Sequence, residues 1–491
     1  MMKVMKKLKK AILLFVAIST LVACKKFDEI NVDPIRTTDV SEDLLFTRVL
    51  RYGALDWDFY QIGQNLHADM FTQYFANLAP GFGTDRYISN PGWISSFWNT
   101  YYANFIINTQ EVIRKTSDDP TKSNKRNVAR IWRAWLFQRA TDYWGDIPYS
   151  EAGRGIDGLR TPKYDKQEDI YADLNKELKE ASAAIDLNKA IKFSGPDLVF
   201  AGDLMKWKKF ANSLRLRIAM RMSKVDPIKA RAIVQEVMTQ NELMTSNSDN
   251  ALMAMQAAGQ FVNRNPLAIM GPWNEFRVSK TMVDLLKNLN DPRLAIYAAP
   301  ITAAGPVTYE GLPNGLNATQ LGQPANAQIN FSGMGASIRA EGAPIDIMTF
   351  SEVSFLKAEA VQRGWGTGSA STFYNEGITA SIARRGAVAP AAVSTYLAQS
   401  SVAYDATLQQ IATQKWLALF PNGFEGWAEW RRTGFPVLTP IPNSDGETGG
   451  TTPRRVIYPP TEAGLNPEAY KAAIARQGAD RMTTRMWWDK L

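Results

Sequence analysis

The spacing of apolar residues is the feature of this sequence that most restricts its fold. From residue 207 to residue 222 an apolar side chain returns every three or four positions, and three arginines fall on the opposite side. The apolar positions are Trp207, Phe210, Ala211, Leu214, Ile218 and Met222, and the arginines are Arg215, Arg217 and Arg221. This spacing predicts an amphipathic helix with a core face and a basic face. Similar spacing predicts helices at about 95–115, 125–144, 166–185, 278–288, 352–363, 371–383 and 408–420.

The predicted fold class is therefore mainly α, and the length is compatible with one large domain or with two or three ordinary ones. The first helix begins near Ser41, and Gly145 and Gly364 follow two of the helical stretches, where a glycine commonly ends a helix. Residues 298–342 and 436–467 are rich in glycine and proline, and loops of this length are usually functional or irregularly packed. No alternation of apolar and polar residues runs through the chain, so only a few short strands are expected.

The N-terminus has the pattern of a bacterial lipoprotein. Five lysines precede an uncharged stretch, residues 11–23, and the sequence Leu-Val-Ala-Cys closes it at Cys24. A basic start and a short apolar stretch are typical of a secretory signal peptide, and this stretch is too short to span a bilayer of about 30 Å. Leu-Val-Ala-Cys resembles the lipobox, whose cysteine is acylated with fatty acids such as palmitate. We expect residues 1–23 to be the signal peptide and residues 24–40 a lipidated tether.

The scarcity of cysteine and histidine and the lack of nucleotide-binding motifs disfavour several kinds of catalytic and metal site. Cys24 is the only cysteine and His67 the only histidine, so an internal disulfide, a catalytic triad and a histidine-cysteine metal site find little support. His67 lies in a helical context, where a packed or hydrogen-bonded role is expected. No Walker loop or dinucleotide fingerprint is present. We therefore expect no enzymatic activity and no cofactor, although a pair of carboxylates acting as a glycosidase stays open because sequence does not show their separation.

The net charge gives no reason to expect nucleic acid as a partner. The chain has 56 basic and 48 acidic residues, a net charge of +8, but five of the lysines lie in the signal peptide and +3 remains for the mature chain. Such a balance exerts no exceptional pull on phosphate.

Aromatic residues in loops are the candidates for ligand contact. Pyranose rings present flat C–H faces that stack on aromatic rings, while their hydroxyls bind amides and charged groups. Residues 81–93 combine glycine and proline with Phe82, Tyr87 and Trp93, so we expect this loop to expose its rings. Trp273 and Asn274, in Gly-Pro-Trp-Asn-Glu, are predicted contacts for the same reason. Four other rings fall at helical spacing and are predicted to lie in the core: Trp98, Tyr101, Tyr102 and Phe105.

Several phrases, in this order along nearly the whole mature chain, resemble the SusD/RagB family, particularly its SusD-like branch. They are FDEINVDP (27–34), TDYWGDIPYSEA (141–152), FANSLRLR (210–217), SKTMV (279–283), DPR (291–293), AEA (358–360), QKW (414–416), EWRRTG (429–434) and RVIYP (455–459). The resemblance implies that residues 41–491 form a single domain. This domain is expected to be a right-handed superhelix of tetratricopeptide-like helix pairs, packed against an irregular, loop-rich lobe with few short strands.

The resemblance also implies a function. Proteins of this family are lipid-anchored on the outer membrane, act as a lid over a SusC-like TonB-dependent transporter, and help to capture oligosaccharides, or in some branches peptides. Asp28 and Glu29, soon after Cys24, resemble a signal for export to the cell exterior, although Lys25 and Lys26 intervene. The leading hypothesis is a glycan-binding accessory lipoprotein. A peptide-binding protein, a mainly structural lid subunit and a glycoside hydrolase are the alternatives.

Overall fold

The computed structural model describes residues 40–54, 59–190, 197–259, 262–301, 306–386, 388–442 and 446–490, together with Met2 and Met5. Residues 42–491 form one compact unit. Apart from Met2, Met5 and Val40, the predicted signal peptide and the tether that begins at Cys24 lie outside the described residues. Within the part that the structure describes, none of the helices combines the length and apolar character needed to cross a membrane.

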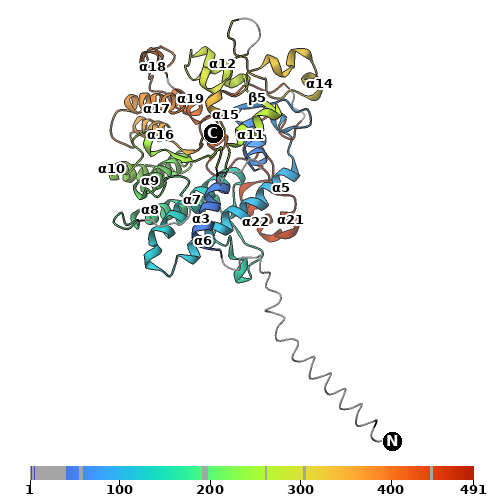
Figure 1. The fold of residues 1–491 in the computed structure, drawn as a ribbon, viewed down its shortest axis with the longest axis vertical. Helices are drawn as coiled ribbons and strands as arrows, with labels where there is room; N and C mark the ends of the chain where they lie inside the picture. Colours follow the sequence, from blue (N-terminus) through green and yellow to red (C-terminus); the bar gives the residue numbers. More distant parts are fainter. Residues whose placement is uncertain are drawn as a thin grey trace. The chain divides into compact units, whose positions relative to one another are not determined.

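Helices that follow one another in the sequence pack side by side, as Figure 1 shows. In the first half these are α3 (Glu42–Gly53), α6 (Ile107–Lys115), α7 (Ser123–Trp144), α8 (Gln167–Ala183), α9 (Leu204–Arg221) and α10 (Pro227–Gln240). In the second half they are α16 (Phe350–Gln362), α17 (Ala370–Arg385), α18 (Pro390–Leu397), α19 (Leu408–Leu419) and α20 (Gly423–Thr433), whereas α22 (Pro467–Gln477) contacts α21 (Glu462–Leu465) and β3 (Tyr164–Asp165). The contact of α16 with α9 joins the two halves. The predicted fold of tetratricopeptide-like helix pairs is confirmed.

The predicted helix at residues 95–115 is a longer helical run made of three parts. α5 (Pro91–Thr100) continues through the π-helical turn η4 (Tyr101–Ile106) into α6. The Asn90 side chain begins α5 by accepting a hydrogen bond from the backbone N–H of Trp93. Gly145 and Gly364 follow α7 and α16 with φ of 91° and 70°, so both predicted helix ends are confirmed. α20 was not predicted: its polar residues Glu425, Glu429 and Arg432 recur at helical spacing, but all of its residues are buried.

The strands of the described part are short and lie in antiparallel pairs. β1 (Phe75–Asn77) pairs with β5 (Phe276–Val278), β2 (Ile147–Pro148) with β3 (Tyr164–Asp165), and β4 (Ala251–Met253) with β6 (Ile345–Met348). α12 (Lys280–Asn288) follows β5 directly. The helices in the described residues of the two predicted loop-rich stretches are short, namely α14 (Ala318–Leu321), α15 (Ala336–Arg339) and α21 (Glu462–Leu465), with single turns at η9 (Pro324–Asn326) and η10 (Gln328–Asn330). The expected small strand content is confirmed.

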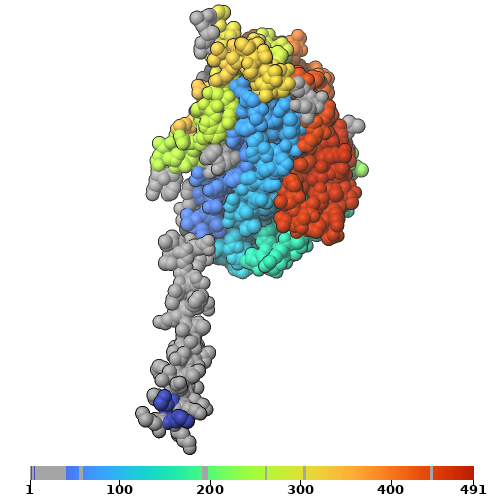
Figure 2. All heavy atoms as spheres, turned by 90° about the vertical axis from the view of Figure 1, so that its right-hand side faces the viewer, coloured from blue at the N-terminus to red at the C-terminus, as the bar shows by residue number. Residues whose placement is uncertain are grey.

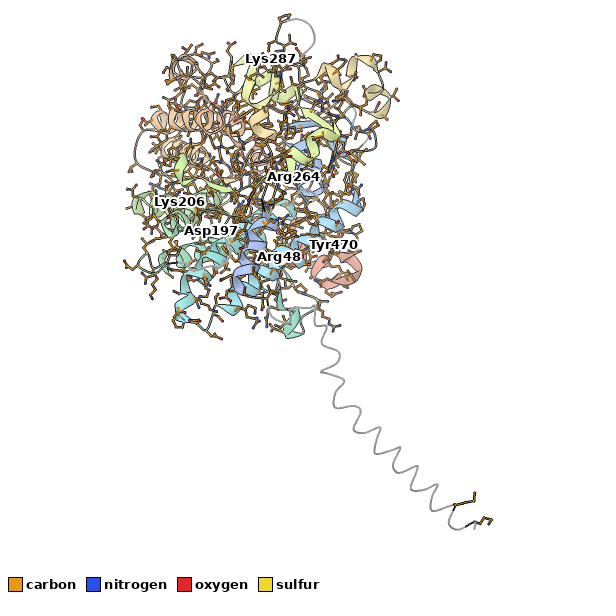
Figure 3. The ribbon with its side chains drawn as sticks, viewed as in Figure 1. Arg48, Asp197, Lys206, Arg264, Lys287 and Tyr470 are labelled. Atoms are coloured by element: carbon orange, nitrogen blue, oxygen red, sulfur yellow. The ribbon has the colours of Figure 1, made fainter. Side chains whose placement is uncertain are left out.

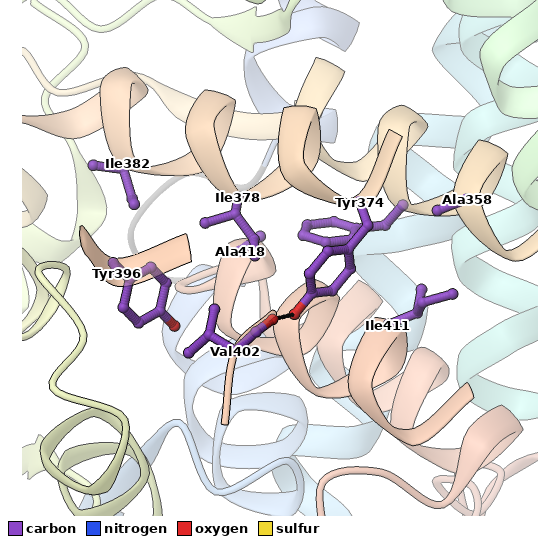
Figure 4. Packing of buried hydrophobic residues seen from close by; sticks show 9 residues of the cluster. Ala358, Tyr374, Ile378, Ile382, Tyr396, Val402, Ile411 and Ala418 are labelled. Atoms are coloured by element: carbon purple, nitrogen blue, oxygen red, sulfur yellow. Dashed lines mark hydrogen bonds between the residues drawn. The ribbon is translucent and has the colours of Figure 1, made fainter. Parts of the chain in front are cut away.

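Apolar side chains fill the space between the helices (Figure 3). One cluster joins α16, α17, α18 and α19, and Figure 4 shows its members around Tyr374 and Ile378. The Tyr374 hydroxyl donates to the carbonyl oxygen of Val402 at 2.7 Å, so this buried polar group keeps a partner. At the start of α9, Asp197 accepts a hydrogen bond from Nε1 of Trp207 at 2.8 Å. Figure 3 labels Asp197.

The arginines of α9 require a correction to the sequence interpretation. Arg215, Arg217 and Arg221 are 1%, 3% and 1% exposed, so the predicted basic face is buried. Arg217 binds Glu352 through Nε at 2.6 Å and Nη2 at 2.7 Å, and Arg221 binds Glu425 through Nη2 at 2.6 Å. A charge can be buried when an opposite charge lies beside it, and carboxylates from distant helices do this for these arginines.

Candidate ligand-binding surface

The pairing of β1 with β5 brings two of the predicted ligand-contact segments to the same end of one ribbon. Asn77 lies opposite Phe276, and the backbone N–H of Leu78 donates to the carbonyl oxygen of Glu275 at 2.7 Å. The loop after β1 and the turn before β5 therefore leave this ribbon side by side. Figure 2 shows the surface of the unit here, where the blue segment around β1 and α5 borders the yellow-green segment that precedes β5.

Phe82 and Trp93 form an aromatic pair on the β1 side. Their ring centroids are 5.2 Å apart in an edge-to-face arrangement, and both side chains are partly exposed. Nδ2 of Asn77 donates to the carbonyl oxygens of Ala79 and Phe82, at 3.0 and 2.6 Å, and holds the loop in place. The structure thus brings two of the three predicted loop rings together and leaves both partly exposed.

Tyr87 is the third predicted ring of this loop, and the expectation that the loop exposes it is wrong. Its side chain is 1% exposed, its ring packs on Phe71 with centroids 6.0 Å apart, and its hydroxyl lies 3.3 Å from Oγ1 of Thr452. Burial raises the pKa of the Tyr87 phenol. The physical reason is that the segment beginning at Gly446 lies against the carbonyl oxygens of Arg86 and Tyr87 and covers the ring.

Trp273 and Asn274 form the β5 side of the surface. Trp273 ends the turn η8 (Gly271–Trp273) and is 40% exposed. Asn274 is exposed and has a φ of 58°, a conformation that asparagine tolerates better than most residues. Its Oδ1 accepts hydrogen bonds from Arg277 Nη2 at 3.1 Å and Gln328 Nε2 at 2.6 Å, and its Nδ2 donates to the Pro272 carbonyl oxygen at 3.1 Å. The amide therefore has a fixed orientation.

Arg277 and Gln328 were missed by the sequence interpretation. Arg277 is 7% exposed, and no carboxylate forms an ion pair with it among the described residues. Burial lowers the pKa of its guanidinium. Gln328 comes from the long loop of residues 298–342. The only signal for Arg277 was an arginine between two apolar residues of a short strand, and nothing marked Gln328.

Asp85 is a buried carboxylate that holds the loop between β1 and α5 in place. It is 1% exposed, and its Oδ2 accepts hydrogen bonds from the backbone N–H groups of Asn77 at 3.1 Å and Gly315 at 3.3 Å. Its Oδ1 is buried and has no hydrogen-bond partner among the described residues. Burial raises the pKa of the carboxyl to about 7, against a usual value near 3.8. Asp85 thus ties the candidate surface to the long loop at Gly315.

The remaining predicted residues lie in the core. His67 is 1% exposed, its Nδ1 is 2.6 Å from the Ile62 carbonyl oxygen, and burial lowers the pKa of its imidazole to about 4. Its predicted packed role is confirmed. Trp98, Tyr101 and Phe105 are buried as predicted, whereas Tyr102 is only partly buried. In the part of the chain that the structure describes, histidine, cysteine and carboxylate side chains do not gather in threes around a possible metal position.

Comparisons with known proteins give a consistent result. A SusD-like family model, described as "Starch-binding associating with outer membrane", matches residues 34–459. A solved chitin-binding protein is 33% identical, with a TM-score of 0.82 over 92% of this chain and 100% of its own. A chitin-binding SusD homologue from Flavobacterium johnsoniae is 29% identical, with a TM-score of 0.81 over 91% and 98% of the two chains. A SusD homologue from Bacteroides vulgatus is also 29% identical, with a TM-score of 0.81 over 91% and 97%. No curated protein matches the chain.

Proposed function

The chain belongs to the SusD-like family, and from that membership we propose that it is an outer-membrane lipoprotein that binds glycans. One observation carries the proposal: the β1–β5 pairing sets the Phe82–Trp93 pair and the Trp273–Asn274 turn at one end of the same ribbon. Aromatic faces and an oriented amide are the groups that a pyranose needs, since its C–H face stacks and its hydroxyls hydrogen-bond.

We propose chitin-derived oligosaccharides as the ligand class to test first. Two similar solved proteins carry the description chitin-binding. The N-acetylglucosamine unit of chitin has an apolar ring face and an acetamido group with a carbonyl acceptor. Among the described residues, Asn274 Nδ2 makes one hydrogen bond, to the carbonyl oxygen of Pro272, so its second N–H is available to such an acceptor. Peptides are the alternative ligand class.

The proposal includes the anchor and the partner. Cys24 carries the lipid, the compact unit of residues 42–491 faces the cell exterior, and the protein acts as the lid of a SusC-like TonB-dependent transporter. Affinity purification through a C-terminal tag from the native membrane tests the partnership. Recovery of a TonB-dependent barrel in stoichiometric amount supports the proposal, and recovery of the protein alone contradicts it.

Calorimetric titration with chitohexaose tests the binding function. The protein begins at residue 25, so it keeps the whole compact unit and lacks the lipid. We expect Trp93→Ala and Trp273→Ala each to weaken binding about tenfold, because each removes one stacking surface. Trp365→Ala is the matched control. Trp365 is also partly exposed, but it lies after α16 and belongs neither to the loop after β1 nor to the turn before β5. Absence of binding to a panel of glycans, or equal affinities for all four proteins, would contradict the proposal.

A further inference from the structure

An open groove of about 620 Å³ lies between the start of α8 and the C-terminal segment. We call it the Trp487 groove. The residues that matter for its chemistry are Lys166, Glu168, Arg476, Arg485, Trp487 and Lys490. None of the four residues of the candidate surface, Phe82, Trp93, Trp273 and Asn274, lines it. Its volume falls in the range of about 300–1,000 Å³ that is typical of sites for small organic ligands.

The wall that carries Trp487 is held rigidly by buried partners. The backbone N–H of Trp487 donates to Oε1 of Gln167 at 3.0 Å, and Gln167 is 1% exposed. The next residue, Trp488, is buried and donates from Nε1 to Asp142 at 2.9 Å. The Trp487 ring packs on Tyr171 with centroids 5.8 Å apart and is itself partly exposed. The groove is therefore formed before any ligand binds, which lowers the entropic cost of binding.

The charged groups of the groove carry both signs. Two carboxylates are already neutralised: Asp146 pairs with Arg476 at 2.8 Å, and Asp489 with Arg485 at 2.7 Å. On the rim, Lys166, Lys490 and Glu168 are exposed, and none of the three forms an ion pair within the described residues. Glu168 would repel an anionic ligand and Lys166 a cationic one, whereas a neutral polyol can donate to the carboxylate and accept from the ammonium.

We propose that the Trp487 groove is a second glycan-binding site, which takes a neutral pyranose chain with one ring stacked on Trp487 and its hydroxyls bound to Glu168 and Lys166. The ligand class rests on the proposed function, but the site is separate from the candidate surface. Two sites on one chain raise the effective affinity for a long polysaccharide that can reach both, because the second contact becomes intramolecular.

Fluorine NMR of protein labelled with 5-fluorotryptophan tests the inference directly. The protein begins at residue 25, and Trp487→Phe, Trp93→Phe and Trp365→Phe assign one resonance each. On titration with chitohexaose we expect the Trp487 resonance to shift and saturate, and the Trp365 resonance to stay in place. The variants Glu168→Gln and Lys166→Met should lower the affinity measured from the Trp487 resonance about tenfold. The affinity measured from the Trp93 resonance should stay unchanged, which also shows that the variants are folded.

The outcomes separate the two proposals. A shift of the Trp93 resonance without one at Trp487 overturns the second site and leaves the proposed function standing. A shift at Trp487 alone supports the groove and overturns the candidate surface as the binding site. If neither resonance moves with chitohexaose, maltohexaose or cellohexaose, both the second site and the glycan-binding function are wrong.

Discussion

Nη2 of Arg277 donates a hydrogen bond to Oδ1 of Asn274 at 3.1 Å, and the same oxygen accepts one from Gln328 at 2.6 Å. A nearly buried cation thus orients an exposed amide at the end of the β1–β5 ribbon. Arg277 has no carboxylate partner among the described residues, so it contributes little to stability in return for its burial. Burial of the Arg277 guanidinium is unfavourable for folding, but this group orders the turn at Asn274. We infer that its role is to position the Asn274 amide for ligand contact.

Arg277→Met separates these two effects. Methionine fills a similar volume without charge, so the free energy of unfolding should stay within about 1 kcal/mol of the original or rise. Without the Nη2 donor the Asn274 amide is less well oriented, and we expect chitohexaose affinity to fall about three- to tenfold. Calorimetry and thermal unfolding measure the two quantities. Arg264→Met is the control, because the pair of Arg264 with Glu341 is solvent-exposed. Unchanged affinity in Arg277→Met would exclude the positioning role.

Asp85→Asn is predicted to change the pH dependence of stability. The pKa of Asp85 is about 7 in the folded protein because of burial, against about 3.8 when the carboxyl is exposed in the unfolded chain. The folded state therefore binds the proton more tightly, and the contribution of this group to stability falls as pH rises from about 4 to about 7. At pH 8 the variant should be more stable than the original, by at most about 4 kcal/mol.

Asparagine suits this position because its Oδ1 can accept from Asn77 and Gly315, while its NH2 takes the place of the oxygen that lacks a partner. Denaturant unfolding at pH 5 and pH 8 measures the effect. Asp157→Asn is the control, since Asp157 is exposed. A stability difference between variant and original that is the same at both pH values would show that Asp85 is ionised throughout.

The Arg217–Glu352 pair should matter far more than a surface ion pair. Both side chains are almost fully buried, at 3% and 1% exposure. Arg217→Met leaves Glu352 buried without its cation, so we expect the free energy of unfolding to fall by about 3–5 kcal/mol. Arg154→Ala breaks the pair with Asp157, whose side chains are 53% exposed, and should cost less than about 1 kcal/mol. Denaturant unfolding compares the two. If both variants lose the same free energy of unfolding, the buried Arg217–Glu352 pair is not what stabilises α9.

The arginines of α9 also show how far the sequence could predict the fold. The spacing from Trp207 to Met222 was sufficient to predict the helix and its apolar face. It could not predict that Arg217 and Arg221 are buried, because their carboxylate partners lie on α16 and α20, more than a hundred residues away. Local periodicity reports which side chains share a helix face, not which distant charges meet that face.

The candidate surface was predictable to a similar extent. Glycine and proline marked the loops that hold Phe82, Trp93 and Trp273, and the strand pairing brings those loops to one end of a ribbon. The burial of Tyr87 was not predictable, because the segment that covers it begins at Gly446, far along the chain. Arg277 was missed for the same kind of reason: its role depends on hydrogen bonds to Asn274, whose own second partner comes from another loop.

Gly423 is predicted to be intolerant of any side chain. A Cβ at this position would lie 2.8 Å from the backbone nitrogen of Asp69 and closer still to its carboxylate. Gly423→Ala must therefore push α20 away from the helix that carries Asp69, at a cost of about 1–3 kcal/mol. Gly464→Ala is the matched control, because a Cβ at Gly464 would meet no atom within 4 Å and alanine favours the helix. A thermal unfolding midpoint of Gly423→Ala as high as that of Gly464→Ala would show that the two segments do not pack this closely.

Cys24→Ala tests the anchor on which the proposed location depends. Each buried methylene contributes about 0.8 kcal/mol to membrane binding, so several acyl chains together should hold the protein on the bilayer and their loss should release it. We expect the original protein in the outer-membrane fraction with a mass increase from acylation at the new N-terminus, and Cys24→Ala absent from the outer-membrane fraction, without that mass increase and with its signal peptide uncut by the lipoprotein peptidase. Lys25→Ala is the control, because it changes the neighbouring residue but keeps the thiol. An unmodified Cys24 in the membrane-bound protein would show that another segment provides the anchor.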